Sequence, residues 1–330
     1  MYLKWPDQIR EVVETWDYYS VRESFRQLVV IGMGGSGIVG DYLQLIAFTR
    51  GGLFIHVVKS HVLPGLISDD TLLLFISYSG NTIETLLAFK DALRRRAKVV
   101  AVSSGGLLEE EALRNNVLHV KIPGNLLPRV SLPSMLYRVL AILDNSGYSL
   151  VTRGEARENM VFLEGVIDIA LRESFDIAYF IDRGIRENRL LILSTHSPLE
   201  PLALRGKNEF NENSKLIVKV DTAPEWMHND IVGYEAPSPR IFSVLEVIDQ
   251  DNEVGVKLVD FMRNIYSRHD TRFHRLVLRG GSILEKLLYG SLVLGLSSVK
   301  LAEMRGVNPT RTESIQLYKR DSSRIFKQEI

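Results

Sequence analysis

The sequence predicts an α/β fold made of two doubly wound, parallel-sheet subdomains with a C-terminal helix. In the first half, short runs of apolar and β-branched residues alternate with segments whose apolar residues recur at helical spacing. That alternation is typical of a parallel sheet with right-handed crossovers. A long helical zone over 152–188 follows, and the second half then repeats the alternation as a degenerate copy. With 330 residues, each half is long enough to bury its own core.

The first domain is placed at residues 1–150 and begins with a segment expected to form one amphipathic helix. Its strands are expected at 28–31, 53–58, 71–76, 98–102 and 117–122, and its helices at 36–48, 82–95, 108–114 and 131–144.

The second domain is placed at residues 151–330. Its strands are expected at 189–193, 215–220, 240–247 and 275–278, and its helices at 198–211, 253–267 and 282–305. The tail, 308–330, is expected to start a polar, charged helix at Pro309. Duplicated α/β units bring the carboxyl ends of their strands to a crevice in which ligands bind, so the candidate functional residues are sought there.

The composition excludes several classes of protein. Lysine plus arginine and aspartate plus glutamate number 40 each, so the formal net charge is zero, whereas nucleic-acid binders usually carry a basic excess. The chain has no cysteine, which excludes disulfides, thiolate nucleophiles and cysteine-ligated metal sites. It contains no HExxH motif, aspartate-rich loop or paired histidines. We therefore expect no nucleic-acid partner, no metal and no other cofactor.

Two stretches bear on export and membrane insertion. The first 20 residues carry acidic side chains in place of a basic start and an apolar run, so they do not resemble a signal peptide. The apolar stretch 283–301 is interrupted by Glu285, Lys286 and Lys300, which favours a helix buried in the protein over a membrane span. We expect a cytoplasmic protein that does not bind membranes.

A glycine cluster follows the first predicted strand and leads into a helix. Unpaired N–H groups at the start of a helix, together with its dipole, attract an anion such as a phosphate. Gly32, Gly34 and Gly37 also match the dinucleotide fingerprint G-x-G-x-x-G. That fingerprint requires an acidic residue at the end of the next strand, where this chain has Lys59. The dinucleotide interpretation is therefore disfavoured, and close packing of strand and helix is the other alternative.

A second loop, at the end of the 71–76 strand, carries hydroxyl groups. Ser77, Ser79 and Thr82 are three hydroxyl residues within six positions of a strand-to-helix turn that also contains Gly80. Such a turn offers side-chain and backbone donors to one bound oxyanion. The alternative is a simple helix cap by Thr82, but one cap needs one hydroxyl, so the pattern favours a ligand site.

Here the chain resembles the sugar isomerase (SIS) domain, which binds phosphosugars. The resemblance rests on Gly34-Gly35-Ser36-Gly37 and on Ser77-x-Ser79-Gly80-Asn81-Thr82. Further motifs are similar to those of the bifunctional phosphoglucose/phosphomannose isomerases of archaea and bacteria: Asn211-Glu212-Asn213-Ser214-Lys215, Pro224-Glu225-x-x-His228-Asn229, Asn308-Pro309, Thr312 and Lys319. The resemblance covers nearly the whole chain in order. It implies two SIS subdomains of the flavodoxin-like or Rossmann-like kind.

The resemblance implies a metal-independent aldose–ketose isomerase that interconverts glucose 6-phosphate and mannose 6-phosphate with fructose 6-phosphate. This reaction opens a cyclic sugar and moves a proton between C1 and C2 through a cis-enediol. One carboxylate can accept and return the same proton if it reaches both carbons from one face. Glu212 is the candidate base, with its asparagine neighbours expected to fix the carboxylate by hydrogen bonds. The alternative is a solvated acidic residue on a turn.

Ring opening needs an acid or base near the ring oxygen, and His228 is the candidate because an imidazole titrates near neutral pH. Lys319 is implied to assist from the C-terminal helix. His196, at a strand end of the second half, is the rival histidine. His56 lies within a predicted strand and is expected to be structural.

The remaining candidate residues bind or shape the substrate. Arg129 matches the family arginine that stabilises the enediolate, and Pro128 fixes its turn. Thr312 corresponds to a position thought to make room for rotation about C2–C3, which would admit both epimers. The phosphate is implied to be held by Gly35, Ser36, Ser77, Ser79 and Thr82. Gly206 departs from the family pattern, which has a larger residue before the Asn-Glu-Asn motif.

The resemblance also implies a homodimer in which the histidine is donated across the interface, so that two subunits share each site. Two alternative functions remain open. One is a phosphosugar-sensing SIS module that binds its ligand without turnover, although no basic recognition helix for DNA is evident at either end. The other is an SIS isomerase of another sugar phosphate, which the combination of Glu212, His228 and Lys319 disfavours.

Overall fold

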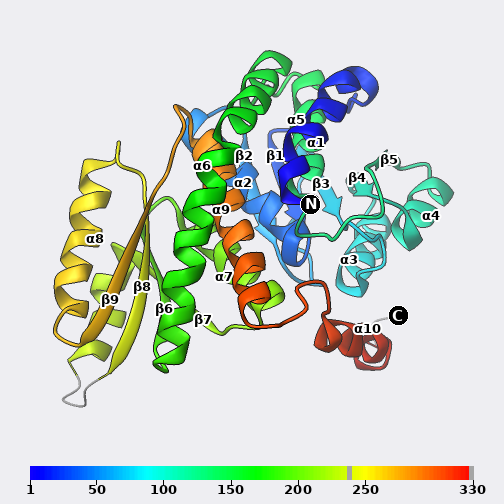
Figure 1. Cartoon of the computed structure of the whole chain (residues 1–330). Coiled ribbons are helices and arrows are strands. Elements are labelled where there is room, and N and C mark those ends of the chain that lie inside the picture. Colours follow the sequence, from blue (N-terminus) through cyan, green and yellow to red (C-terminus); the bar gives the residue numbers. More distant parts are fainter. Residues whose placement is uncertain (236–239, 327–330) are drawn as a thin grey trace. The chain divides into compact units, whose positions relative to one another are not determined.

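The computed structural model describes residues 1–235 and 240–326 of the chain (Figure 1). The chain divides into two compact units. The first comprises residues 1, 3–161 and 312–330, and the second comprises residues 2 and 162–311, as far as these ranges are described. The C-terminal helix belongs to the first unit, and the ranges 1–150 and 151–330 stay a prediction of domain bounds.

The first unit is built on one parallel sheet of five strands in the order β2-β1-β3-β4-β5. Its strands are β1 (Gln27–Ile31), β2 (Phe54–Val58), β3 (Thr71–Ile76), β4 (Lys98–Ser103) and β5 (Leu118–Lys121). Its helices are α1 (Trp5–Glu14), α2 (Gly34–Arg50), α3 (Ile83–Arg94), α4 (Gly106–Arg114), α5 (Leu132–Asn145) and α10 (Glu313–Ile325), together with the start of α6 (Arg153–Arg186).

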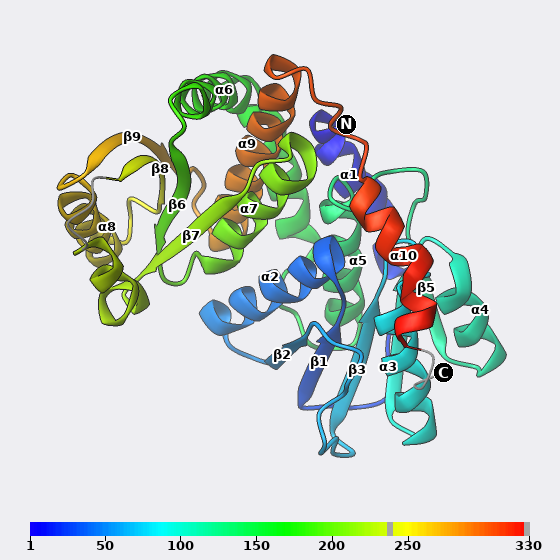
Figure 2. The same cartoon turned by 90° about the horizontal axis from the view of Figure 1, so that it is seen from below.

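Helices cover both faces of this sheet (Figure 2). Val29, Ile31, Leu73 and Phe75 alternate along β1 and β3, so their side chains share one face, where they pack with buried residues of α3 and α4. Helices α2 and α5 contact each other, and α1 packs on α5. Strand β3 lies between β1 and β4 and is buried at all six positions, which explains its uninterrupted apolar sequence.

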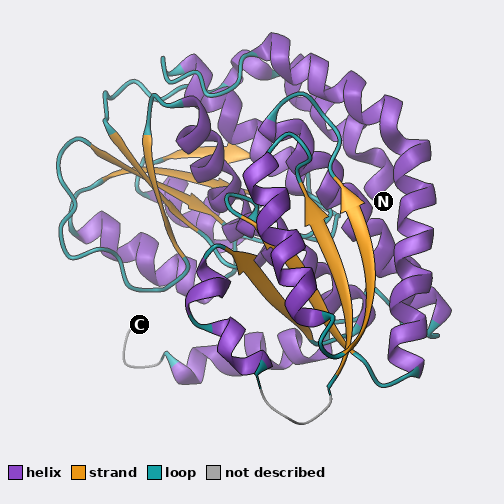
Figure 3. Ribbon diagram, turned by 90° about the vertical axis from the view of Figure 1, so that its left-hand side faces the viewer, coloured by secondary structure: helices purple, strands orange, loops and turns teal. Residues whose placement is uncertain are grey.

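The second unit repeats the topology with one strand fewer. Its sheet has the order β7-β6-β8-β9, which corresponds to β2-β1-β3-β4 in the first unit, so the predicted duplication is confirmed. In both sheets the strands lie between helices (Figure 3). The elements are β6 (Leu190–His196), α7 (Glu200–Ser214), β7 (Val218–Ala223), the 3₁₀ helices η3 (Glu225–His228) and η4 (Asp230–Tyr234), β8 (Ile241–Ile248), α8 (Glu253–Tyr266), β9 (Asp270–Val277) and α9 (Ile283–Met304).

Some predicted boundaries were wrong, for local reasons. Strand β9 begins at Asp270, five residues before the predicted start, because β8 supplies its hydrogen bonds and an edge strand can carry polar residues. Helix α10 begins at Glu313 instead of Pro309, because the Asn308 side chain accepts hydrogen bonds from the backbone and hydroxyl groups of Thr310 and forms a turn. Residues 327–330 of the predicted tail lie outside the described residues.

Helix α9 is, among the described residues, the one helix long and apolar enough to span a membrane by length and composition. In the folded chain, however, 72% of its apolar window is buried within the protein. It packs against α7. The prediction of a buried helix is therefore confirmed.

Gly206 occupies the contact between α7 and α9. A Cβ atom at this position would lie 2.8 Å from Cδ1 of Leu294 and 3.2 Å from Cδ1 of Leu193. Both leucines are fully buried. The two leucines therefore fill the space that a larger residue at position 206 would need. This packing explains why the chain has glycine here and departs from the family pattern.

We predict that Gly206→Ala is about 1–3 kcal/mol less stable than Gly165→Ala, because the added methyl group overpacks the α7–α9 contact. Gly165 lies on α6, and a Cβ atom there would have no neighbour within 4 Å, so its substitution is the matched helical control. Urea unfolding of the two variants measures the difference. Equal stabilities would contradict the packing explanation.

Candidate active site

The glycine loop and the hydroxyl loop of the first unit lie next to each other. They follow β1 and β3, which pair in parallel, so both loops leave the carboxyl edge of the sheet at adjacent positions. The strand order reverses between these two strands, and ligands of doubly wound sheets bind at such a point. The backbone N–H of Tyr78 donates to Oγ of Ser36 at 3.2 Å, which joins the two loops directly.

Pro128 and Arg129 come to the same edge. A Cβ atom on Gly35 would lie 3.3 Å from the carbonyl oxygen of Pro128 and 3.5 Å from the nitrogen of Arg129. The absence of a side chain at Gly35 thus allows the Pro128–Arg129 backbone to approach the glycine loop. Arg129 is 5% exposed. The sheet edge therefore collects seven predicted residues: Gly35, Ser36, Ser77, Ser79, Thr82, Pro128 and Arg129.

The turn that carries Arg129 is held by helix α1, a feature that the sequence analysis missed. Nε1 of Trp5 and Nε2 of Gln8 both donate to the carbonyl of Val130, at 2.8 and 3.1 Å. The side-chain oxygen of Gln8 accepts from the backbone and hydroxyl groups of Ser134. Trp5 and Gln8 are buried residues of an amphipathic helix. Nothing in the sequence indicates that this turn is their hydrogen-bond partner.

Helices α2 and α3, which start at this edge, have open N-termini. Among the residues that the structure describes, no side chain caps α2 or α3. Thr82 stands at the N-cap position of α3, but its Oγ1 accepts a hydrogen bond from Oγ of Ser77 at 3.1 Å. A side-chain cap stabilises a helix by roughly 1 kcal/mol, so a hydroxyl at the cap position that makes no such bond favours the ligand interpretation over simple capping.

The corresponding edge of the second unit differs. There Asn252 caps α8, the counterpart of α3, by accepting from the N–H of Gly255 at 2.9 Å. Asp249 and Asp251 lie beside this cap, and both form ion pairs with the nearly buried Lys286, at 2.7 and 2.6 Å. Capped N–H groups and neighbouring carboxylates make this edge unfavourable for a phosphate. The N-terminus of α8 is therefore less suited to a phosphate than that of its counterpart α3.

The hydroxyl loop is supported from behind by the turn between β4 and α4. Gly80 has a φ of +68°, and a Cβ atom there would lie 1.7 Å from the carbonyl oxygen of Gly105. The N–H of Leu107 donates to Oδ1 of Asn81, and the N–H of Leu108 donates to the carbonyl of Gly80. The Gly105-Gly106 pair at a strand end was the sequence signal for this support, and our sequence analysis did not use it.

His119 lies behind this supporting turn. Its Nε2 is 2.8 Å from Oγ of Ser103, whose hydroxyl contacts Gly105. Burial lowers the pKa of His119, although Glu109 acts against that shift.

Helix α10 places Thr312 and Lys319 in the first unit. It packs against α3, as Figure 2 shows, and the Tyr318 hydroxyl donates to the carboxylate of Glu84 in the first turn of α3. That hydrogen bond raises the pKa of Tyr318 to about 12. Thr312 is the N-cap residue of α10, and Lys319 is exposed beside Tyr318. Both predicted residues thus lie on an element that contacts the helix of the hydroxyl loop.

Glu212 and His228 belong to the second unit and lie on different elements. Glu212 is half-buried near the end of α7, whereas the sequence analysis allowed for a turn. His228 ends the 3₁₀ helix η3 with an exposed side chain, and the neighbouring Trp226 anchors this helix at 1% exposure.

The asparagines beside Glu212 also contact other groups of the second unit. Nδ2 of Asn213 donates to Oε2 of Glu209 at 2.9 Å and to Oγ of Ser298 at 2.8 Å. Asn211, with its amide nitrogen turned inward, donates to the carbonyls of Lys207 and Leu216. Along a helix, adjacent residues point in different directions, so these amides fix the helix end and a different carboxylate.

The rival histidine is structural. His196 is fully buried, its Nδ1 lies 3.0 Å from the carbonyl oxygen of Ser197, and its Nε2 accepts from the N–H of Asp249 at 3.1 Å. Both ring nitrogens therefore have backbone partners. His56 lies in the edge strand β2, as predicted, with an exposed side chain.

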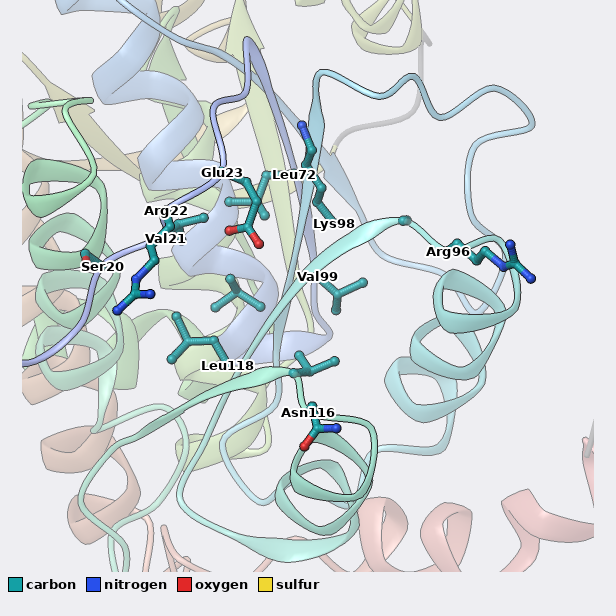
Figure 4. Close-up of a pocket in the computed structure, with 13 residues that line it drawn as sticks. Ser20, Val21, Arg22, Glu23, Leu72, Arg96, Lys98, Val99, Asn116 and Leu118 are labelled. Atoms are coloured by element: carbon teal, nitrogen blue, oxygen red, sulfur yellow. The ribbon is translucent and has the colours of Figure 1, made fainter.

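A cavity of about 470 Å³ lies at the opposite, amino edge of the first sheet (Figure 4). Leu72, Val99 and Leu118 line it from β3, β4 and β5, and the guanidinium groups of Arg22 and Arg96 lie at its margins. The predicted residues do not line this cavity. In the described part of the chain, no group of three or more histidines and carboxylates could hold a metal ion.

Comparisons with known proteins identify the family of the chain. Residues 23–141 match a family model for the SIS domain, and residues 176–321 match one for the bacterial phospho-glucose isomerase C-terminal SIS domain. The chain is 35% identical to the bifunctional phosphoglucose/phosphomannose isomerase of Aeropyrum pernix, over 97% of this chain and 96% of that protein. It is 32% identical to the protein of the same name from Aquifex aeolicus, over 90% of each chain.

A solved structure shares the fold. The C-terminal domain of glucosamine-fructose-6-phosphate aminotransferase from Francisella tularensis superimposes with a TM-score of 0.71 at 13% identity. The match covers 94% of this chain and 96% of that one.

We predict that Gly80→Ala removes anion binding, because the new side chain would collide with the backbone of Gly105 and displace the hydroxyl loop. The measurement is the rise in melting temperature that inorganic phosphate produces by binding the folded state. Gly65→Ala is the control, since the space around Gly65 is open. A full phosphate-dependent rise in Gly80→Ala would refute the assignment of this loop.

Proposed function

Because this chain belongs to the bifunctional phosphoglucose/phosphomannose isomerase family, we propose that it interconverts glucose 6-phosphate and mannose 6-phosphate with fructose 6-phosphate. One observation carries the proposal: at the carboxyl edge of the first sheet, hydroxyl groups and uncapped helix N-termini offer donors to one phosphate. The reaction is a step shared by glycolysis and gluconeogenesis.

The phosphate is held by Ser36, Ser77, Ser79 and Thr82, with Gly35 allowing close approach of the backbone. Neutral hydroxyl and amide donors bind a doubly charged phosphate while the helix dipoles supply the positive potential. Ser77 and Ser36 are buried at 2% and 5% exposure, so their hydroxyls are fixed before the substrate arrives. Binding at this point fixes one end of the sugar and leaves C1 and C2 free to react.

Glu212 transfers the proton. In its ionised form the carboxylate removes the proton from C2 of the open-chain aldose and returns it to C1, while the C1 carbonyl oxygen gains a proton and the C2 hydroxyl loses one. Charge develops on an oxygen of the enediolate, and the guanidinium of Arg129 stabilises it. Arg129 suits this role because its turn is held by Trp5 and Gln8.

His228 and Lys319 open the ring. An imidazole near neutral pH can take the proton of the anomeric hydroxyl, and a proton returns to the ring oxygen. Thr312 leaves room for rotation about C2–C3, so that either epimer can present C2 to the same base. Every proton in this sequence moves between a side chain and the sugar, and we propose a reaction that needs no metal.

We further propose a cytoplasmic homodimer in which His228 serves the site of the partner subunit. Two observations support this assembly. The His228 side chain is exposed, and α6 exposes Leu171, Phe175 and Tyr179 at helical spacing, which forms an apolar stripe of the kind that subunit interfaces cover.

We predict that Glu212→Gln lowers the turnover of both aldose phosphates by at least about a thousandfold, because the amide keeps the shape of the side chain and cannot act as the base. Binding of fructose 6-phosphate should persist. The assays follow both substrates in the presence of a chelator. Glu253→Gln, an exposed position on α8, is the control.

Near wild-type turnover in Glu212→Gln would overturn the assignment of the base. Loss of wild-type activity on addition of the chelator would overturn metal independence.

We predict that mixing Glu212→Gln with His228→Ala restores activity, although each variant alone is inactive. A heterodimer would combine the intact histidine of one subunit with the intact glutamate of the other in one complete site. About a quarter of the wild-type rate is expected after free exchange of subunits, because about half of the dimers would carry one active site. An inactive mixture in which heterodimers have been verified would contradict a shared site.

A further inference from the structure

The buried face of α7 carries a polar cluster next to Glu212. Arg205, Glu209 and Asn213 follow one another at intervals of four residues, so they share one face of the helix. None of the three is more than 2% exposed, and Arg205 and Glu209 form an ion pair. Such a face is normally apolar, because burying charges costs more than burying aliphatic side chains of the same volume.

Tyr2 enters this cluster from the other end of the sequence. It is 4% exposed, belongs to the second unit, and its hydroxyl donates to the carboxylate of Glu209. Its ring lies against α9, where a Cβ atom on Gly295 would be 2.6 Å from Cε1 of the tyrosine. Burial, and then the charge of Glu209, raise the pKa of Tyr2 well above its usual value, so the phenol remains a donor.

Asn213 extends the cluster to α9. Its Nδ2 contacts Oε2 of Glu209 at 2.9 Å, Oγ of Ser298 at 2.8 Å and the hydroxyl of Tyr2 at 3.2 Å. The hydroxyl of the next residue, Ser214, donates to the carbonyl of Ser298 at 2.6 Å. The last turn of α7 is thereby attached to α9 at two consecutive residues.

Glu212 lies inside the part of α7 that these contacts hold. It is preceded three positions earlier by Glu209 and followed directly by Asn213. The helix ends at Ser214. The following Lys215 has a left-handed backbone, and its Nζ donates to the carbonyl of Glu212 at 2.6 Å. Hydrogen bonds therefore fix the backbone on both sides of the proposed base.

We propose that Tyr2 is a positioning residue for Glu212 and acts through Glu209 and Asn213. The inference rests on the proposed role of Glu212 as the base. A carboxylate that serves C1 and C2 from one face must be placed to within a fraction of an ångström, and directional hydrogen bonds can impose that placement where apolar contacts cannot. The accurate placement of the end of α7, and of Glu212 on it, is then the reason why these polar groups are buried despite their cost.

The test is Tyr2→Phe, which keeps the ring against Gly295 and removes only the hydroxyl. We expect kcat to fall about tenfold with KM for fructose 6-phosphate unchanged, because the phosphate loops lie on other elements. The isotope effect with deuterium at C2 of glucose 6-phosphate should rise, because a misplaced base makes proton transfer rate-limiting. A loss that was only structural would lower the melting temperature without changing the isotope effect.

Tyr289→Phe is the matched control. Its hydroxyl also donates to a glutamate, Glu173, at 2.5 Å, and it lies on α9 away from the last turn of α7. We expect its kcat to equal that of the wild type. If Tyr2→Phe does not fold, Ser298→Ala takes its place, because it removes the anchor of Asn213 and should lower kcat in the same way.

The outcomes separate the inference from the function on which it rests. An inactive Glu212→Gln together with wild-type kcat and isotope effect in Tyr2→Phe, or in Ser298→Ala where that replaces it, would overturn the positioning role alone. An active Glu212→Gln would overturn the proposed base and the inference with it. A tenfold loss of kcat in Tyr2→Phe and Ser298→Ala, with wild-type kcat in Tyr289→Phe, would support the proposed base and the positioning role of Tyr2.

Discussion

The unpaired N–H groups at the carboxyl edge of a parallel sheet are the constraint on which this molecule depends. Every strand in both sheets is parallel, so each helix that follows a strand begins at that edge with N–H groups that no carbonyl of its own helix can accept. The second unit satisfies one such helix with Asn252 and surrounds it with Asp249 and Asp251. The first unit leaves α2 and α3 without side-chain caps in the described residues, so the counterpart helices α3 and α8 differ at this edge.

Close backbone packing holds the open edge in shape. Gly35 lies against the Pro128–Arg129 turn, Gly80 lies against Gly105, and Ser36 links the two loops. A side chain at Gly80 would collide with Gly105, and one at Gly35 would press on the Pro128 backbone. The neutral donors proposed to orient the phosphate lie on the first unit, whereas the groups proposed to move protons, Glu212 and His228, lie on the second unit.

The sequence predicted those parts of the structure that are governed by local rules. Alternating strand and helix patterns located all nine strands of the described chain, because buried parallel strands must be apolar. The glycine loop and the hydroxyl loop were located because both patterns stand directly after a predicted strand. The partners of polar residues were not predictable, since they depend on tertiary contacts. The contact of Asn213 with Glu209 was not foreseen, and neither Tyr2 nor Trp5 carries a local pattern that reveals its distant acceptor.

The central claim is that one carboxylate carries one proton between C1 and C2 on a single face of the sugar. The most direct measurement is the fate of deuterium when glucose 6-phosphate labelled at C2 is isomerised by the wild-type protein in ordinary water, with the product analysed by NMR early in the reaction. The account predicts that the deuterium found at C1 of fructose 6-phosphate occupies one of the two positions only, and that part of the label is lost to solvent. Label divided between both positions, or retained completely as in a hydride shift, would contradict it.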